Sequence, residues 1–177
     1  MLTQLIIPNK YINASLKDFP EDVLKQITEK TKSSFYIMGE PNTGKSHLAW
    51  ALYKNHYGNE KLYKPLTIGI FVNALTLKFE IADANKEGSE NSPYKLLQKY
   101  SNTGLLIIDD ISAVEKITDY TFEMFYQIIN SRYENERQII FTSNVPLDML
   151  KFDERIVRRI EEISQLVWLT ERHLTNK

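Results

Sequence analysis

Residues 39–46 have the sequence Gly-Glu-Pro-Asn-Thr-Gly-Lys-Ser, which is a complete G-x-x-x-x-G-K-S pattern. An apolar run at residues 34–38 precedes the pattern, and a segment with helical periodicity follows it over residues 45–57. The two glycines, Gly39 and Gly44, permit backbone angles and a close approach that a side chain would prevent. The backbone N–H groups of such a loop, together with the N-terminus of the next helix, form a concave site for anions. We therefore predict a strand, a phosphate-binding loop and a helix here.

Two side chains of this loop have a defined task in binding a nucleoside triphosphate. The Lys45 ammonium reaches the β- and γ-phosphates, and the Ser46 hydroxyl ligates Mg²⁺. The residues expected to contact the nucleotide are Gly39, Glu40, Pro41, Asn42, Thr43, Gly44, Lys45, Ser46 and His47. A glycine turn without function is the alternative, but the strand before the loop and the helix after it argue against that alternative.

Short apolar runs alternate with longer amphipathic segments along the rest of the chain. Strands are predicted at residues 34–38, 67–72, 104–108, 138–142 and 166–169, and helices at residues 45–57, 75–85 and 118–134. Most of these strands are almost continuously apolar, as expected of strands that helices cover on both faces. A polar loop is expected at residues 83–92. The pattern predicts one α/β domain with a five-stranded parallel sheet between helices.

Polar residues follow two more of the predicted strands. Asp109 and Asp110 end the apolar run at residues 105–108, and Asn144 follows the run at residues 139–142. Ligands of parallel sheets bind at the carboxyl ends of the strands. We predict that Asp109 holds Mg²⁺ through its water shell, that Asp110 polarises the attacking water, and that Asn144 hydrogen-bonds the γ-phosphate or this water. A helix cap is the alternative for the carboxylates, and an ordinary turn is the alternative for Asn144.

Arg155 and Arg159 are candidates for a catalytic arginine. They are four positions apart within residues 153–160, so a helix places them on one face. An arginine that reaches the γ-phosphate of a neighbouring subunit stabilises the transition state and can raise the rate by ~10³ or more. We predict this role for the pair, with Arg159 ahead of Arg155. A solvated basic patch balanced by nearby glutamates is the alternative.

The composition limits the classes of function. The chain has 177 residues, of which 42% are hydrophobic, and this suits one domain with a real core. With 22 basic and 23 acidic residues it is not a polycation, so any nucleic-acid binding must come from a local patch or from several subunits together. The absence of cysteine excludes disulfides, thiolate zinc sites and cysteine catalysis. The sequence has neither a secretory signal nor an apolar run of roughly 18 residues, and a cytoplasmic location is expected.

With these four elements in this order, the chain resembles the AAA+ superfamily. More narrowly, it resembles the ATPase domain of the DnaC/DnaI-type bacterial helicase loaders, which are related to IstB and DnaA. The resemblance extends over nearly the whole chain and implies that residues 1–33 flank the nucleotide site and that residues 34–177 form the AAA+ core. Residues 8–19 are similar to the family's N-terminal segment beside the adenine, residues 130–133 and 139–144 to its helix and sensor strand, and residues 153–160 to its arginine-finger box.

The resemblance also implies roles for the site residues. Lys45 and Ser46 correspond to the Walker A pair, Asp109 and Asp110 to Walker B, Asn144 to the first sensor, and Arg159 to the finger that acts on the next subunit. The implied cofactors are ATP and Mg²⁺, and the implied activity is ATP hydrolysis in a homo-oligomer with shared active sites. Slow hydrolysis is expected because Walker B ends in Asp-Asp here, whereas many ATPases carry Asp-Glu.

Loaders of this type hold single-stranded DNA while they open a replicative helicase, and the resemblance implies both partners for this chain. In the family, a hydroxyl residue and a tyrosine after Walker B help to grip the strand, and Thr118 and Tyr120 match them loosely. Lys78 and Lys86 are further candidates for DNA contacts. A solvated helix face explains the lysines equally well, and core packing explains Tyr120 equally well.

One departure from the loaders leaves other functions open. We expect no separate N-terminal helicase-binding domain, because the N-terminal segment starts within a dozen residues of Met1. We also expect no helical lid after the fifth strand, a feature that the loaders largely lack as well, whereas initiators keep it. A transposition helper of the IstB type, which acts on double-stranded DNA with a transposase, is one alternative. A nucleotide-gated interaction module without hydrolysis is another, and a small-molecule kinase is less favoured.

Overall fold

The computed structural model describes residues 7–29, 32, 34–58, 69–86, 88–90 and 92–170. Its centre is a sheet of the strands β1 (Ser34–Gly39), β2 (Ile70–Asn73), β3 (Leu106–Asp109), β4 (Ile139–Ser143) and β5 (Ser164–Leu169). The strands lie in the order β2-β3-β4-β1-β5, and each neighbouring pair is parallel. The predicted five-stranded parallel sheet is therefore confirmed.

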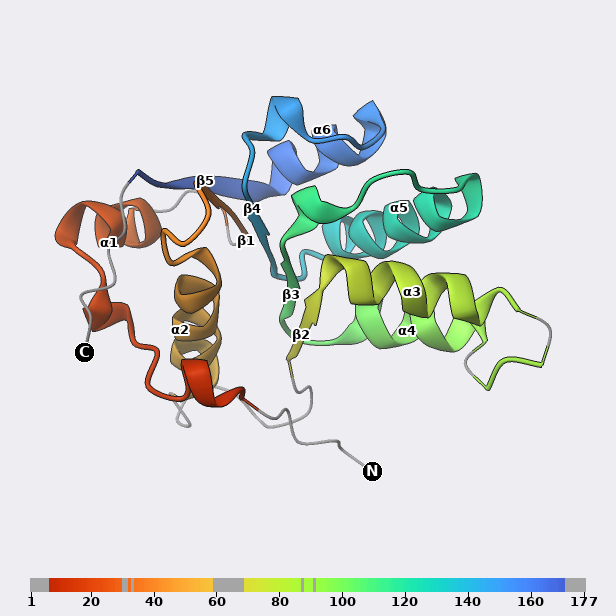
Figure 1. Ribbon diagram of the computed structural model, residues 1–177, viewed down its shortest axis with the longest axis horizontal. Helices are drawn as coiled ribbons and strands as arrows, with labels where there is room; N and C mark the ends of the chain where they lie inside the picture. Colours follow the sequence, from red (N-terminus) through yellow and green to blue (C-terminus); the bar gives the residue numbers. More distant parts are fainter. Residues whose placement is uncertain are drawn as a thin grey trace.

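Helices cover both faces of this sheet (Figure 1). On one side lie α1 (Glu21–Thr28) and α2 (Lys45–Gly58), and on the other lie α3 (Ala74–Ala84), α4 (Pro93–Asn102), α5 (Asp119–Glu134) and α6 (Glu154–Ile163). Among the described residues, no helix has both the length and the apolar character needed to cross a bilayer.

The second strand, the fifth strand and one helix differ most from the sequence prediction. The predicted start of the second strand, at residue 67, lies outside the described residues, and β2 begins at Ile70. β5 begins earlier than predicted, at Ser164, because α6 runs directly into it and the Ser164 N–H still bonds to the helix. The sequence pattern did not predict α4, which begins where the Ser92 hydroxyl accepts the Lys95 N–H and Pro93 occupies the first turn.

Alternate side chains of the strands enter two separate apolar cores. Phe35 and Ile37 of β1 join the cluster formed with α1 and α2. Tyr36 and Met38 join the cluster formed with α3, α4, α5 and α6. This alternation follows from the two-residue period of a strand. Because the side chains within the strands are buried in the two cores, only residues at the strand ends remain to form a site.

The N-terminal segment consists of two short 3-10 helices, η1 (Asn9–Tyr11) and η2 (Leu16–Asp18), that precede α1. Lys54 of α2 fastens this segment, because its Nζ donates to the carbonyl oxygens of Ile12 at 2.7 Å and Ala14 at 2.9 Å. The segment therefore lies against the helix that follows the phosphate-binding loop.

Arg132 of α5 is fully buried at the amino ends of β3 and β4. Its guanidinium donates hydrogen bonds to five backbone carbonyl groups, those of Tyr100, Ser101, Thr103, Gly104 and Gln138. These carbonyls belong to the end of α4 and to the segments that lead into β3 and β4. One side chain thus satisfies the polar backbone where two strands begin.

Candidate active site

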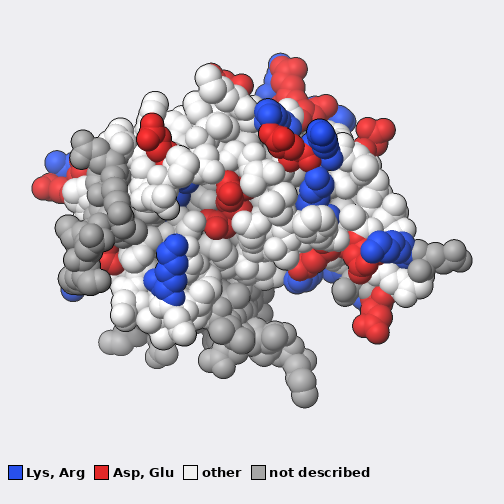
Figure 2. Space-filling model, viewed as in Figure 1, with Lys and Arg blue, Asp and Glu red and all other residues white. Residues whose placement is uncertain are grey.

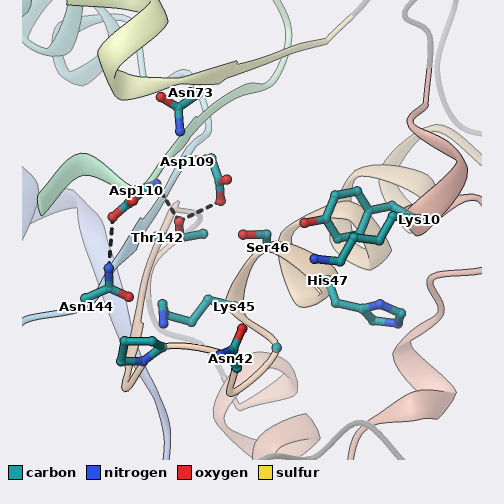
Figure 3. A pocket seen from close by; sticks show the side chains of 13 residues that line it. Lys10, Asn42, Lys45, Ser46, His47, Asn73, Asp109, Asp110, Thr142 and Asn144 are labelled. Atoms are coloured by element: carbon teal, nitrogen blue, oxygen red, sulfur yellow. Dashed lines mark hydrogen bonds between the residues drawn. The ribbon is translucent and has the colours of Figure 1, made fainter. Parts of the chain in front are cut away.

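An open pocket of about 330 Å³ lies at the carboxyl edge of the sheet, where the loops after β1, β3 and β4 meet (Figure 3). Its lining residues come from the N-terminal segment, the predicted phosphate-binding loop and three strand ends: Lys10, Tyr11, Pro41, Asn42, Gly44, Lys45, Ser46, His47, Asn73, Asp109, Asp110, Thr142 and Asn144. The structure therefore brings together the loop, the carboxylates of Asp109 and Asp110, and Asn144, which lie in separate segments of the sequence.

The loop after β1 needs glycine at two positions for different reasons. A Cβ on Gly39 would lie 2.3 Å from the carbonyl oxygen of Leu169 and 2.9 Å from Thr43 Oγ1, so the position has no room for a side chain. Gly44 has a φ of 104°, in the region that favours glycine, and Asn42 also has a positive φ of 67°. Glycine is thus needed at the start of the loop because a side chain would not fit, and at its end because the backbone has a positive φ.

Lys45 opens α2 and folds back over the loop. Its Nζ donates to the carbonyl oxygens of Gly39 at 2.8 Å and Glu40 at 2.7 Å, and the side chain is buried. Burial lowers the pKa of Lys45, while the nearby carboxylates of Asp110 and Asp109 act in the opposite direction. The ammonium therefore lies between carbonyl oxygens and carboxylates, in the position where it can meet a phosphate.

Asp109 ends β3 beside Ser46 (Figure 3). Burial raises the pKa of Asp109, and hydrogen bonds from the Thr142 and Ser46 hydroxyls partly offset this effect. The Thr142 hydroxyl donates to Asp109 Oδ1 at 2.7 Å, and its oxygen, Thr142 Oγ1, accepts the backbone N–H of Asp110 at 2.8 Å. Thr142 of β4 thus connects both carboxylate residues to the neighbouring strand.

Asp110 has a left-handed backbone, with φ 56° and ψ 54°, and precedes the 3-10 helix η3 (Ile111–Ala113). Its Oδ1 accepts hydrogen bonds from Asn144 Nδ2 at 3.1 Å and from the Ser112 hydroxyl at 3.2 Å. The Ser112 hydroxyl in turn accepts the backbone N–H of Asn144 at 3.0 Å. Asp110 and Asn144 are therefore direct neighbours at the pocket.

The oxygen donors suit Mg²⁺. In the part of the chain that the structure describes, no group of three or more acidic or histidine side chains could enclose a metal ion. Mg²⁺ commonly needs no such group, because it keeps several waters and is held by one or two carboxylates together with substrate phosphates. The Ser46 hydroxyl and the Asp109 carboxylate, which face each other here, supply this kind of partial shell.

Two lining residues, Asn73 and Thr142, received no functional role in the sequence prediction. Thr142 was predicted at the polar end of its strand, beside the other loops, but without a role in binding or catalysis. Asn73, at the end of β2, lies in register with Asp109. Lys10 and Tyr11 also line the pocket, and they lie within residues 8–19, the segment that the resemblance placed beside the adenine. A signal existed for Asn73 and Thr142, since both are polar residues at or next to the end of an apolar strand.

His47 lies in the pocket wall, and its ring also connects two segments. Its Nε2 lies 2.8 Å from Asp18 Oδ2, and its ring contacts those of Tyr11 and Phe19. Asp18 additionally accepts the backbone N–H of Ser15 in a capping box. Through His47 the N-terminal segment is thus attached to the phosphate-binding loop.

Arg155 and Arg159 lie on α6, and neither is among the residues that line the pocket. Arg159 donates to Asn130 Oδ1 at 3.1 Å and to Glu162 at 2.8 Å, and its guanidinium lies 4.4 Å from the centre of the Tyr133 ring. Arg155 pairs with Asp153. Both arginines are held against neighbouring side chains, outside the pocket of this chain.

Arg155 also rests on two aromatic rings of α5. Its guanidinium lies 4.6 Å from the centre of the Phe122 ring and 5.5 Å from that of Tyr126. Arginine on an aromatic face keeps its charge while losing part of its conformational freedom. The face of α5 next to α6 therefore orients both arginines.

The four candidate DNA residues have separate local partners. Lys78 donates to the carbonyl oxygen of Glu115, and Lys86 pairs with Asp83. Thr118 caps α5, and Tyr120 is half-buried against the core. On the face shown in Figure 2, basic and acidic side chains are interspersed, and the described residues form no continuous basic stripe there.

Comparison with known proteins gives concordant results. The family model for the bacterial DnaA ATPase domain matches residues 9–164. The chromosomal replication initiator protein DnaA of Streptococcus thermophilus is 30% identical over 135 residues, which are 74% of this chain but 28% of that protein. The chain thus spans less than a third of this relative.

Two solved structures have the same fold. The crystal structure of the DnaC helicase loader covers 92% of this chain and 100% of its own, with a TM-score of 0.70 and 24% identity. The replication initiator DnaA bound to AMPPCP and single-stranded DNA covers 93% of this chain and 51% of its own, with a TM-score of 0.71 and 25% identity. The predicted resemblance to AAA+ domains of the DnaC and DnaA type is confirmed.

Proposed function

Because the chain belongs to the bacterial DnaA ATPase-domain family, we propose that it binds ATP with Mg²⁺ in the pocket and hydrolyses it slowly. The observation that carries this proposal is the meeting of Lys45, Asp109 and Asn144, from three different loops, around one pocket (Figure 3). A cation, a carboxylate and an amide at the same sheet edge are what a magnesium-bound polyphosphate requires.

Each part of the reaction has a residue suited to it. Lys45 Nζ exchanges the carbonyl oxygens of Gly39 and Glu40 for phosphate oxygens, while the N-terminus of α2 faces the same anion. Ser46 and Asp109 would hold Mg²⁺, and the chemistry that this ion would supply is neutralisation of charge on the phosphate oxygens. Asp110 orients the attacking water and draws its proton, and Asn144 fixes the water against the terminal phosphate.

Slow hydrolysis follows from the position of Asp110. Its side chain is shorter than that of glutamate, and its Oδ1 is already engaged by Asn144 and Ser112. A shorter side chain holds its carboxylate farther from a water at the terminal phosphate, so proton transfer to it is less efficient.

Arg159 completes the site of a neighbouring subunit. Two observations support this role. Arg159 lies on α6, outside the pocket of its own chain, and three contacts hold its guanidinium in a fixed direction. Arg155 lies one helical turn earlier and assists at the same interface. ATP therefore binds between copies of the chain, and assembly and hydrolysis are coupled.

The assembly binds single-stranded DNA and assists the loading of a replicative helicase. The shared fold with the DnaC helicase loader and with DnaA in complex with single-stranded DNA supports this role. Lys78, Lys86 and Thr118 are exposed or half-exposed and remain candidates for contacts with the strand. Since Tyr120 packs against the core, its contribution is the weakest of the four.

The test is ATP turnover by the purified chain with and without a single-stranded oligonucleotide. Lys45→Ala and Arg159→Ala are each expected to abolish turnover, and mixing the two variants should restore part of it because intact sites then form between subunits. Lys25→Ala and Arg158→Ala are matched controls, as both side chains are exposed and each pairs with a glutamate on its own helix.

Other outcomes distinguish the alternatives. ATP binding without turnover under any condition would indicate a nucleotide-gated interaction module. Tighter binding to duplex than to single-stranded DNA at the same salt concentration would favour the transposition-helper function. No binding of magnesium-ATP at all would refute the proposal.

A further inference from the structure

Two hydroxyl groups join the end of β3 to the end of β4, and both have the same bonding pattern. The Thr142 hydroxyl donates to the Asp109 carboxylate and accepts the Asp110 N–H. The Ser112 hydroxyl donates to the Asp110 carboxylate and accepts the Asn144 N–H. A hydroxyl has one donor and two acceptor positions, so each of these groups can maintain both contacts at once.

These bridges act on groups that otherwise have conformational freedom. Asp110 has a left-handed backbone, which persists only where the surroundings enforce it. Thr142 enforces it from β4 through the Asp110 N–H, and Ser112 fixes the Asp110 side chain from the other direction. Thr142 is 1% exposed, so water cannot replace its hydroxyl.

We propose that Thr142 and Ser112 are positioning residues for ATP hydrolysis: Thr142 directs Asp109 toward the metal, and Ser112 keeps Asp110 and Asn144 at a fixed separation around the attacking water. This inference rests on the ATPase function proposed above. Neither hydroxyl touches the reacting atoms, since each acts through a carboxylate.

The two bridges should affect different steps. Thr142 bonds to the carboxylate that holds Mg²⁺, so its loss weakens magnesium-dependent nucleotide binding. Ser112 bonds to Asp110 and to the backbone of Asn144, so its loss slows turnover and leaves binding intact. Partners of metal-binding and catalytic groups typically contribute about 10- to 100-fold in affinity or activity.

The experiment compares Thr142→Val, Thr142→Ser and Ser112→Ala with the wild-type chain. A fluorescent ATP analogue is titrated at equilibrium, once in EDTA and once over a series of Mg²⁺ concentrations, and turnover is measured separately. Ser92→Ala is the matched control, because that hydroxyl also accepts a backbone N–H but lies at the start of α4, away from the pocket lining. Thermal unfolding of each variant checks that the chain is folded.

For Thr142→Val, we expect the Mg²⁺ concentration at half-saturation to rise about 10-fold or more, with affinity in EDTA unchanged. Thr142→Ser should restore the wild-type value because it returns the hydroxyl. For Ser112→Ala, we expect kcat to fall about 10-fold or more, with KM and the Mg²⁺ dependence unchanged.

Three outcomes would overturn the inference: a Thr142→Val variant with wild-type Mg²⁺ dependence, a Thr142→Ser variant that fails to restore it, or a Ser112→Ala variant with wild-type kcat. If Thr142→Val does not fold, Ser112→Ala and Thr142→Ser still decide the matter, since the first must lose turnover and the second must keep it. A wild-type chain that binds no magnesium-ATP would instead refute the proposed function.

Discussion

The two ends of the same sheet use polar groups in opposite ways. At the amino edge, the Arg132 guanidinium satisfies five backbone carbonyls and is fully shielded from water. At the carboxyl edge, Asp109, Asp110 and Asn144 bond to one another through two hydroxyls and still face an open pocket.

The difference shows how one sheet can combine stability with function. Buried polar groups that bond to one another inside the protein stabilise the fold, because removing one partner leaves the other unpaired at a cost in free energy. Polar groups that are gathered around a pocket can bind a ligand, but two carboxylates placed side by side repel each other. We therefore expect substitutions at the amino edge to affect mainly folding and those at the carboxyl edge to affect mainly activity.

The largest expected effect is that of Arg132→Met at the amino edge. The substitution leaves several carbonyls buried without a donor, and each such group costs about 1–3 kcal/mol, so the free energy of unfolding should fall by about 3 kcal/mol or more. Urea denaturation measures this change. The exposed Arg158→Met is the control and should stay within about 0.5 kcal/mol of the wild type. Equal losses for both variants would mean that Arg132 does not hold the amino edge together.

Gly39→Ala tests the boundary between folding and function, because Gly39 ends β1 and starts the phosphate-binding loop. The added Cβ would meet the Leu169 carbonyl oxygen at 2.3 Å. Overpacking of this kind costs about 1–3 kcal/mol, and the displaced loop should also bind nucleotide more weakly.

Gly88→Ala is the matched control for this substitution. Gly88 has a φ of 78° with no atom near the position of the added Cβ, so alanine there costs stability only through backbone strain. Both glycine variants should lose stability in urea denaturation, but only Gly39→Ala should lose affinity for ATP. Wild-type affinity for ATP in Gly39→Ala would show that nucleotide binding does not depend on the conformation of this loop.

The smallest expected effect has the opposite sign. Burial raises the pKa of Asp109, so its ionised form destabilises the folded chain at neutral pH. Asp109→Asn should therefore raise the free energy of unfolding, by about 0.5–2 kcal/mol, while it abolishes magnesium-dependent turnover. The gain should shrink as the pH falls toward the ordinary carboxyl value of 3.8, since the wild-type group is then protonated.

Urea denaturation in EDTA as a function of pH measures this gain. Asp153→Asn is the contrasting variant. Hydrogen bonds from Arg155 lower the pKa of Asp153, so the ionised carboxylate stabilises the folded chain, and its removal should cost stability at neutral pH. A lower free energy of unfolding for Asp109→Asn would show that the ionised Asp109 carboxylate does not destabilise the folded chain.

The sequence was most informative at the carboxyl edge. The phosphate-binding loop could be predicted because its glycines and Lys45 follow a fixed pattern next to a strand. Asp109 and Asn144 could be predicted because the ends of parallel strands meet at one edge, so their order in the chain implies that they lie close together.

The amino edge and the supporting contacts could not be predicted in the same way. An arginine on an amphipathic helix is ordinarily exposed, and the burial of Arg132 depends on where the end of α4 lies, a helix that the pattern did not predict. The bridges of Thr142 and Ser112 depend on the register of β3 with β4 and on the turn after β3, which a local pattern does not specify.

The most direct test is an equilibrium titration of the wild-type chain with ATP, carried out with Mg²⁺ and again with EDTA, beside the same titrations of Lys45→Ala. Saturable binding that tightens when Mg²⁺ is present, and that Lys45→Ala loses, is the result expected if the cation, the carboxylate and the amide at this edge serve one phosphate. Binding that ignores Mg²⁺, or that survives the loss of the Lys45 ammonium, would contradict it.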